Sequence, residues 1–232
     1  MKLALDAAWP YQGLTYPNPA VGCVVLDKYG ALLSIEAHQK AGEAHAELRA
    51  VATALHRLNP KLSFPVSPEE LHSFIIKNHQ NLLKDSLVYV TLEPCNHQGS
   101  TPPCSKILEA VGIKRLCVGA LEENQKASGG AKYLKDAGMD VKTKIMEKEC
   151  NLLIAPFRAW QDGHFSFAKL AMTNNGTMDG GIISGISSRI HLHALRNVIT
   201  MLAIGGNTVR KDKPKLDARL VNGRAPNVFI YS

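Results

Sequence analysis

The sequence predicts an α/β protein in which helices pack on a single mixed sheet. Two apolar runs flank a polar turn at residues 27–30, which is typical of an antiparallel β-hairpin. Beyond the hairpin, short apolar runs alternate with segments whose apolar residues repeat at helical spacing. An antiparallel hairpin followed by alternating helices and strands indicates one sheet with both strand orientations and helices packed against it.

The elements of the first part follow in the order strand, strand, helix, strand, helix, strand, helix, strand. The hairpin lies within residues 18–39, and the first helix begins near His45, because Leu48, Val51 and Leu55 then take up helical spacing. The later elements are a strand at 86–94, a helix at 105–113, a strand at 115–121, a helix at 129–138 and a strand at 139–145. Residues 59–86 interrupt this order with a proline-rich stretch and a short amphipathic helix, to which the sequence assigns no chemistry.

A second domain is expected after residue 162. Residues 147–163 read as a connecting helix, which gives a first domain over 1–147, a connecting segment over 148–162 and a second domain over 163–232. The elements expected in the second domain are a strand and turn at 165–176, a helix at 189–200, a strand at 201–209 and a strand at 225–232.

Composition indicates a soluble globular protein located in the cytoplasm. Of the 232 residues, 45% are hydrophobic and 20% are charged. The longest apolar runs, at residues 21–26 and 201–204, are far shorter than the roughly 20 residues of a membrane-spanning helix. Trp9-Pro10 interrupts the N-terminal stretch before a long apolar region develops, so the sequence shows no signal-peptide pattern. The net charge of +7 comes from scattered basic residues, so it does not favour a nucleic-acid partner. Five cysteines, an odd number, favour reduced thiols and metal ligands over a disulfide framework.

Three residues, His45, Cys95 and Cys104, could bind a catalytic zinc ion. Imidazole and thiolate are strong zinc ligands, and a catalytic site combines three protein ligands with a water molecule. Cys95 follows the expected strand at 86–94, whereas His45 and Cys104 lie where helices begin. A His-x-Glu alone is common by chance, and two cysteines in one loop are as compatible with ordinary thiols as with metal ligands. The joint arrangement of the two motifs favours the metal site.

Glu47 supplies the remaining chemistry of such a site. Zinc lowers the pKa of its bound water toward neutrality, and an unligated carboxylate can transfer the water proton to a leaving amine. A His-x-Glu followed by Pro-Cys and a second Cys is the signature of zinc nucleobase deaminases, although the interval from Cys95 to Cys104 is longer than their Cys-x-x-Cys. The sequence therefore predicts a zinc-dependent deaminase.

Three stretches in order, TYPNPAVGCVV, HQKAGEAHAE and TLEPCNHQGSTPPC, resemble the bifunctional riboflavin-biosynthesis deaminase/reductase family over about residues 1–147. The resemblance implies a three-layer cytidine-deaminase-like domain and hydrolytic deamination of 2,5-diamino-6-ribosylamino-4(3H)-pyrimidinone 5′-phosphate. It also implies that the substrate pocket or phosphate site is lined by Asn18, His38, His97 and Thr101.

FAKLAMTNNGTMDG and MLAIGGNTVRKDKPKLDARL resemble the start of the reductase half of the same family. This implies the N-terminal part of a dihydrofolate-reductase-like α/β domain that uses NADPH, with Lys169, Thr208 and Asp212 as candidate site residues. Complete reductase halves continue beyond the position of Ser232, so the resemblance implies an incomplete domain, whose reductase activity stays open.

Two other functions stay open. A deaminase of tRNA adenosine or a free nucleobase would have a basic groove beside the zinc and salt-dependent substrate binding. A zinc-stabilised interaction module without catalysis would bind zinc with no open water position. The expected partner is a phosphorylated ribosylaminopyrimidine rather than nucleic acid or a membrane, and homo-oligomerisation is undecided.

Overall fold

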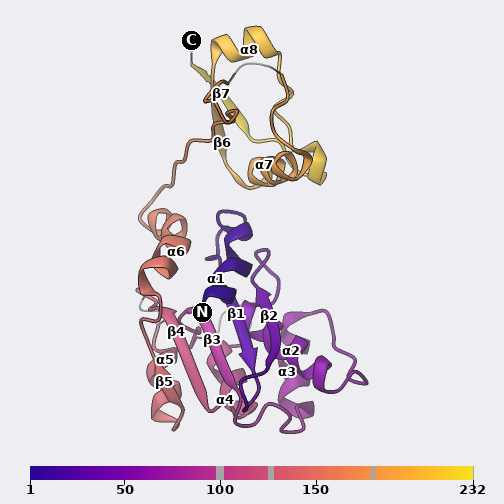
Figure 1. The fold of residues 1–232 in the computed structure, drawn as a ribbon, viewed down its shortest axis with the longest axis vertical. Helices are drawn as coiled ribbons and strands as arrows, with labels where there is room; N and C mark the ends of the chain where they lie inside the picture. The colour runs from indigo at the N-terminus through magenta and orange to yellow at the C-terminus, as the bar shows by residue number, and fades with distance from the viewer. Residues whose placement is uncertain (98–101, 125–127, 179–180, 232) are drawn as a thin grey trace. The chain divides into compact units, whose positions relative to one another are not determined.

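A computed structural model describes residues 1–97, 102–124, 128–178 and 181–231 (Figure 1). The chain divides into two compact units, residues 1–163 and residues 164–232. In the described ranges, no helix combines the length and the apolar character that crossing a bilayer requires.

The first unit is built on a five-stranded mixed sheet with the strand order β2-β1-β3-β4-β5. The strands are β1 (Gly22–Leu26), β2 (Leu32–Ala37), β3 (Leu87–Leu92), β4 (Arg115–Ala120) and β5 (Asp140–Lys142). β1 pairs antiparallel with both β2 and β3, whereas β3, β4 and β5 run parallel to one another. The α/β class and the mixed sheet expected from the sequence are thus confirmed.

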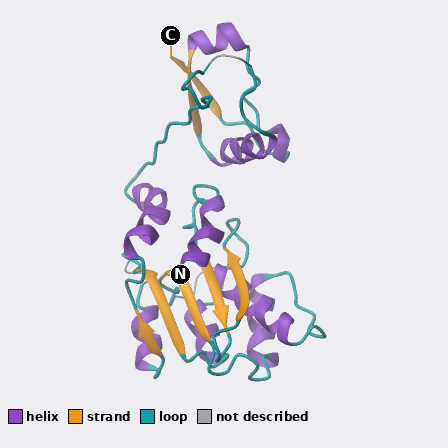
Figure 2. Cartoon of the chain, in the orientation of Figure 1, coloured by secondary structure: helices purple, strands orange, loops and turns teal. Residues whose placement is uncertain are grey.

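Helices cover both faces of this sheet (Figure 2). They are α1 (Lys2–Ala8), α2 (Ala46–Leu58), α3 (Pro68–Asn78), α4 (Cys104–Ala110), α5 (Gly130–Asp136) and α6 (Glu147–Gln161), with a 3-10 turn at Trp9–Tyr11. α1 and α6 approach the sheet so closely that a Cβ added at Gly22 would lie 1.9 Å from the Ala4 carbonyl oxygen, and one at Gly119 2.2 Å from Cys150 Sγ. Neighbouring residues of a strand face opposite sides, so Cys23, which is buried near Glu47, faces α2. These contacts give three layers, helix, sheet and helix.

The two ends of the first unit differ from the sequence-based expectation. α1 was not expected, because its seven residues are too few to give a clear periodic pattern. It is fixed by tertiary burial of Ala4, Leu5 and Ala8 instead. α6, expected only as a connection, buries Cys150 and Leu153 and packs against β4 and α1, so it lies within the first unit.

In the described part of the second unit, a parallel pair of strands is accompanied by three helical segments. They are β6 (Met201–Gly205), β7 (Asn227–Tyr231), α7 (Ile186–Val198), α8 (Gly206–Asp212) and a 3-10 turn at Arg219–Val221. The prediction of a strand within residues 165–176 was wrong, because these residues form no strand. Their backbone closes a turn, in which Gly176 N–H donates to the Thr173 carbonyl and Thr173 N–H donates to the Thr177 carbonyl. Phe167 and Leu170 there are 48% and 70% exposed, and no described neighbouring strand satisfies the backbone. The strand predicted over 201–209 ends at Gly205, and α8 begins at the next residue, Gly206.

Glu93 ties the end of β3 to the loop that leads into α5. The residue is 9% exposed, and its carboxylate accepts hydrogen bonds from the backbone N–H groups of Glu122 (3.1 Å), Gly129 (3.2 Å) and Ala131 (2.9 Å). Hydrogen bonds to an ionised acceptor are stronger than neutral ones, and buried N–H groups left without an acceptor are costly. Glu93 therefore fixes the end of β3 against the loop before α5, two residues before Cys95 in the sequence.

Replacing Glu93 by Ala is expected to lower the free energy of unfolding of the first unit by about 2–4 kcal/mol, since three N–H groups lose a charged acceptor. Urea denaturation measures this, and both tryptophans, Trp9 and Trp160, lie in the first unit and report its unfolding by fluorescence. Glu70→Ala, at an exposed position of α3, is the control, with an expected change below about 0.5 kcal/mol. Equal losses of unfolding free energy in the two variants would contradict the stabilising role given to the Glu93 carboxylate.

Candidate metal centre

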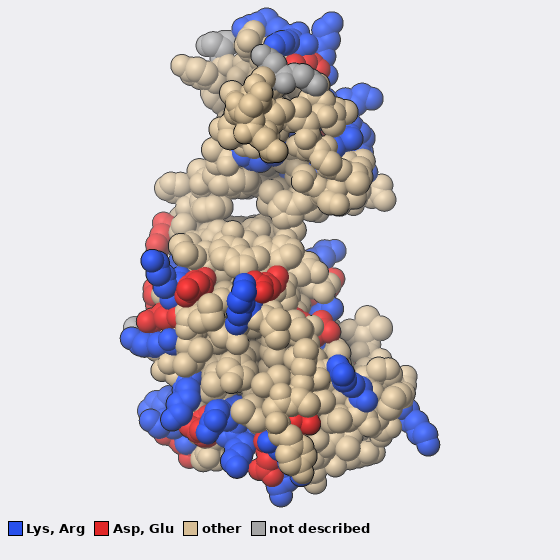
Figure 3. All heavy atoms as spheres, in the orientation of Figure 1, with Lys and Arg blue, Asp and Glu red and all other residues tan. Residues whose placement is uncertain are grey.

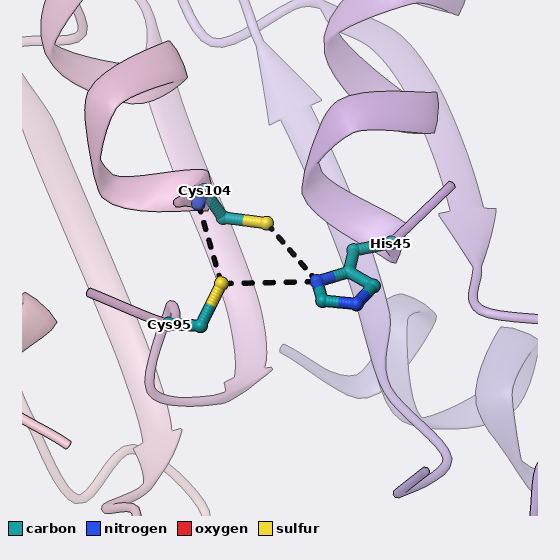
Figure 4. Close-up of side chains that lie close together, drawn as sticks. All are labelled: His45, Cys95 and Cys104. Atoms are coloured by element: carbon teal, nitrogen blue, oxygen red, sulfur yellow. Dashed lines mark hydrogen bonds between the residues drawn. The ribbon is translucent and has the colours of Figure 1, made fainter. Parts of the chain in front are cut away.

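Three elements bring His45, Cys95 and Cys104 together at one end of the sheet. Cys95 lies three residues beyond the end of β3, His45 is the N-cap of α2, and Cys104 is the first residue of α4. α2 and α4 pack against each other, so their first residues meet beside the loop that follows β3. In Figure 4 both sulfur atoms point toward the same ring nitrogen of His45.

The donor atoms have the spacing of a zinc site. His45 Nδ1 lies 3.4 Å from Cys104 Sγ and 3.8 Å from Cys95 Sγ, and the three ligand atoms all lie within 4.8 Å of one another. A tetrahedral zinc with ordinary Zn–N and Zn–S bonds would hold such nitrogen and sulfur atoms about 3.6 Å apart. One imidazole and two thiols at this spacing fit a zinc ion with a fourth position left for another ligand.

Hydrogen bonds prepare one of the two thiols for ionisation. The Cys104 thiol, the His45 ring and the Cys104 backbone N–H, 3.3 Å from Cys95 Sγ, all stabilise a Cys95 thiolate and lower its pKa. The adjacent Cys95 sulfur and burial raise the pKa of Cys104, so the pair retains one proton. The pKa of His45 is raised, mainly by the hydrogen bond to Cys95. A divalent cation at this point would favour the thiolate form of both cysteines.

Glu47 lies beside these residues, in the first turn of α2, without joining the group of ligand atoms. Glu47 is 4% exposed, and its pKa is raised to about 7, mainly by burial and to a smaller extent by the negative charge of Cys95. The Cys104 thiol donates a hydrogen bond that opposes part of this shift. A carboxyl group with such a pKa can both take up and release a proton near neutral pH.

Asn18 and His38 form a hydrogen-bonded pair next to the same residues. His38 Nδ1 lies 3.2 Å from the Ala44 carbonyl, which can only accept, so Nδ1 donates and Nε2 accepts from Asn18 Nδ2 at 3.1 Å. Burial lowers the pKa of His38 to about 4, so the ring is neutral. Its edge meets the His45 ring with centroids 5.5 Å apart.

The other sequence-based candidates do not join this group. His97 is exposed, and Thr101 lies outside the described residues. In the second unit Thr208 and Asp212 both lie on α8, whereas Lys169 lies in a segment without helix or strand, and all three are exposed. No hydrogen bond or ion pair joins these three among the residues that the structure describes.

Two residues near the site were missed by the sequence analysis. Glu93 carried a usable signal, because a carboxylate at the end of a buried apolar strand needs hydrogen-bond partners. His72 on α3 carried none, since nothing in its sequence context distinguishes it from the other unassigned histidines.

Comparison with known proteins adds the family context. Residues 1–120 match the model of the cytidine and deoxycytidylate deaminase zinc-binding region. The chain is 36% identical over 229 residues to the riboflavin biosynthesis protein RibD of Aquifex aeolicus, a match that covers 95% of this chain and 57% of that protein. It is 32% identical over 234 residues to RibD of Actinobacillus pleuropneumoniae, covering 97% of this chain and 55% of that protein. The chain thus spans little more than half the length of these relatives.

Solved structures agree with this likeness. One from Thermotoga maritima, described as a diaminohydroxyphosphoribosylaminopyrimidine deaminase/5-amino-6-(5-phosphoribosylamino)uracil reductase, matches with a TM-score of 0.70 and 29% identity, over 99% of this chain and 61% of that chain. RibD of Acinetobacter baumannii, in one crystal form, matches with a TM-score of 0.63 and 26% identity over the same shares of the two chains.

Proposed function

Because the chain belongs to the cytidine and deoxycytidylate deaminase family with a zinc-binding region, we propose that it is a zinc-dependent hydrolase that deaminates a pyrimidine. The observation that carries the proposal is the group formed by His45, Cys95 and Cys104, with the buried carboxyl of Glu47 beside it. Three ligands and one proton-transferring carboxyl are the parts that hydrolytic deamination requires.

The proposed substrate is 2,5-diamino-6-ribosylamino-4(3H)-pyrimidinone 5′-phosphate, in riboflavin biosynthesis. This proposal is supported by the relatives, which are named as riboflavin biosynthesis proteins, and by the Thermotoga maritima protein, which is described as a deaminase of a phosphoribosylaminopyrimidine. A net charge of +7 is compatible with a phosphorylated substrate. Asn18, His38, His97 and Thr101 are proposed as substrate contacts.

His45, Cys95 and Cys104 would hold the zinc ion, which supplies the Lewis acidity that makes a water molecule nucleophilic near neutral pH. Glu47 would take a proton from the attacking water through its carboxylate and deliver it to the amino group that leaves. The water oxygen forms a bond to the ring carbon, the carbon–nitrogen bond breaks, and ammonia departs. Neutral His38 fixes the Asn18 amide by accepting from its Nδ2, which leaves Asn18 Oδ1 able to accept a hydrogen bond from the substrate.

A reductase role for residues 163–232, with NADPH as hydride donor, is a second and separate proposal. Its candidate residues are Lys169, Thr208 and Asp212, and its support is the likeness to relatives whose full chains are much longer than this one. Cytoplasmic location and the absence of a nucleic-acid partner stay predictions, and homo-oligomerisation stays undecided.

Ammonia release by the zinc-loaded protein tests the proposed function. The diaminopyrimidinone ribosyl phosphate is compared with its dephosphorylated form, with cytidine and with tRNA as substrates. Faster turnover of the phosphorylated pyrimidine than of the other three is the expected result. Turnover of tRNA or cytidine alone would reassign the substrate. Stoichiometric zinc without any ammonia release would leave either another aminopurine or aminopyrimidine substrate or a zinc-stabilised interaction module.

A further inference from the structure

The loop at residues 12–18 leads from the first helical segments of the chain to Asn18, the proposed substrate contact. It follows the 3-10 turn at Trp9–Tyr11 and ends in a turn in which Asn18 N–H donates to the Thr15 carbonyl at 2.9 Å. The Thr15 hydroxyl donates to the Asn18 carbonyl at 2.8 Å, and Thr15 is only 1% exposed. Asn18 is thus joined firmly to Thr15, so the position of this loop decides where the Asn18 side chain lies.

Helix α6 offers this loop an unusual backbone acceptor. Pro156 lies inside α6 and has no N–H, so the Leu152 carbonyl, four residues earlier, cannot receive its usual helical hydrogen bond. The proline ring also crowds the same carbonyl. Backbone carbonyls are strong acceptors that need a partner, so this one is available to a donor from outside the helix.

The Gln12 side chain is that donor. Its Nε2 lies 2.9 Å from the Leu152 carbonyl oxygen and 3.0 Å from the Leu153 carbonyl oxygen. Both partners can only accept, so the nitrogen of the amide faces them, and its two hydrogens allow one hydrogen bond to each. In Figure 1 the indigo segment that follows α1 accordingly lies beside α6. Gln12 therefore attaches the start of the loop to the point where Pro156 interrupts the helix.

A second contact joins the same loop to the same helix. The Tyr16 ring stacks on the ring of Trp160, with an angle of 18° between the ring planes, and Trp160 lies about one turn beyond Pro156 on α6. α6 is itself fixed to the sheet, because Arg158 Nη2 donates at 3.1 Å to the carbonyl of Leu121, the residue that follows β4. The loop before Asn18 is thus held at two positions against a helix that is anchored on the sheet.

These two contacts involve no charged group. Gln12, Tyr16 and Trp160 carry no net charge, and Figure 3 shows basic and acidic side chains mixed over the displayed face of the first unit, without a continuous basic surface over it. Salt screens interactions between charges. The attachment of the loop to α6 should therefore not depend on salt concentration.

We propose that Gln12 is a positioning residue of the substrate pocket, which fixes the loop so that Asn18 pairs with His38 and presents its Oδ1 to the substrate. The Asn18 Nδ2 donates to His38 Nε2 at 3.1 Å, and this bond requires the loop to lie where Gln12 holds it. The inference rests on the proposed function in that Asn18 is taken to contact the pyrimidine. In this role Gln12 acts through Asn18.

The first arm of the test uses no substrate and compares three variants by NMR of the Asn18 side-chain amide, which is assigned by its absence in Asn18→Asp. Gln12→Met keeps the length and removes the donor, and Gln12→Glu removes the donor in the same shape, so an unfolded Met variant still leaves a comparison. Gln12→Lys keeps a donor that can reach both carbonyls. We expect the Met and Glu variants to shift the Asn18 signals toward those of a hydrated amide, and Gln12→Lys to retain the wild-type signals in large part.

The second arm measures steady-state ammonia release from the diaminopyrimidinone ribosyl phosphate. Gln12→Met should raise KM about tenfold and change kcat less than about threefold, because a hydrogen bond made equally to substrate and transition state affects KM alone. Gln161→Met is the matched control, the same substitution at an exposed position of α6. It should leave both the Asn18 signals and KM at their wild-type values.

Wild-type Asn18 signals in both Gln12→Met and Gln12→Glu would overturn the proposal, as would shifted signals with an unchanged KM. Equal changes in Gln161→Met would overturn it as well. If the wild-type protein releases no ammonia, the deaminase assignment fails, while the Asn18 signals still decide whether Gln12 positions this side chain. The two failures are therefore distinguishable.

Discussion

Glu47→Gln is expected to lower kcat for ammonia release by about 10²–10⁴-fold, which is the usual contribution of a positioned general acid/base. Gln keeps the size of the side chain and can still form hydrogen bonds, but it cannot take a proton from water and pass it to the leaving amine. Because Glu47 is not among the grouped ligand atoms, the zinc content should stay at the wild-type value. Steady-state kinetics and metal analysis of the same preparation measure the two quantities.

Glu43→Gln is the matched control for this substitution. Glu43 lies just before α2, its side chain is 46% exposed, and its contact with Arg49 is a long 3.9 Å. An exposed ion pair of this kind contributes little, so kcat should change less than about twofold. Wild-type turnover in Glu47→Gln, with Glu43→Gln equally active, would exclude Glu47 as the proton-transferring group.

Cys104→Ser is expected to weaken zinc binding at least about a hundredfold and to abolish turnover at limiting metal. Apparent binding free energies of structural zinc sites are about 10–16 kcal/mol, so losing one thiolate of such a set costs roughly 3 kcal/mol. Chelator competition measures the affinity, and addition of excess zinc should restore activity only in part.

Cys117→Ser is the control for the loss of a thiol. Cys117 is 6% exposed on β4, on the sheet face opposite α2 and α4, as its strand register with Tyr89 and Val24 indicates. Its substitution should affect stability but leave zinc affinity unchanged. The ligand assignment would be refuted by a Cys104→Ser protein that retains zinc as tightly as Cys117→Ser.

Much of the first unit could be predicted because its signals are local. The turn at residues 27–30 and the periodic apolar residues of α2 each depend on a few neighbouring positions. α1 could not be predicted, since seven residues give no reliable period and burial of Leu5 against the sheet decides its conformation. The prediction of a strand within residues 165–176 failed for the converse reason: apolar residues alone do not make a strand where no described strand lies beside them to pair with.

The sequence by itself determined which residues could carry the chemistry: one imidazole, two thiols and a carboxyl, placed at a strand end and two helix starts. Those identities follow from ligand chemistry and local pattern, which neighbouring residues encode. Only the tertiary structure decided that His45 Nδ1 lies 3.4 Å from Cys104 Sγ and 3.8 Å from Cys95 Sγ, and that Glu47 is buried beside them. His45 lies 50 and 59 positions from Cys95 and Cys104 along the chain, and they meet only when α2 and α4 pack together. That packing depends on side-chain volume and burial over the whole unit.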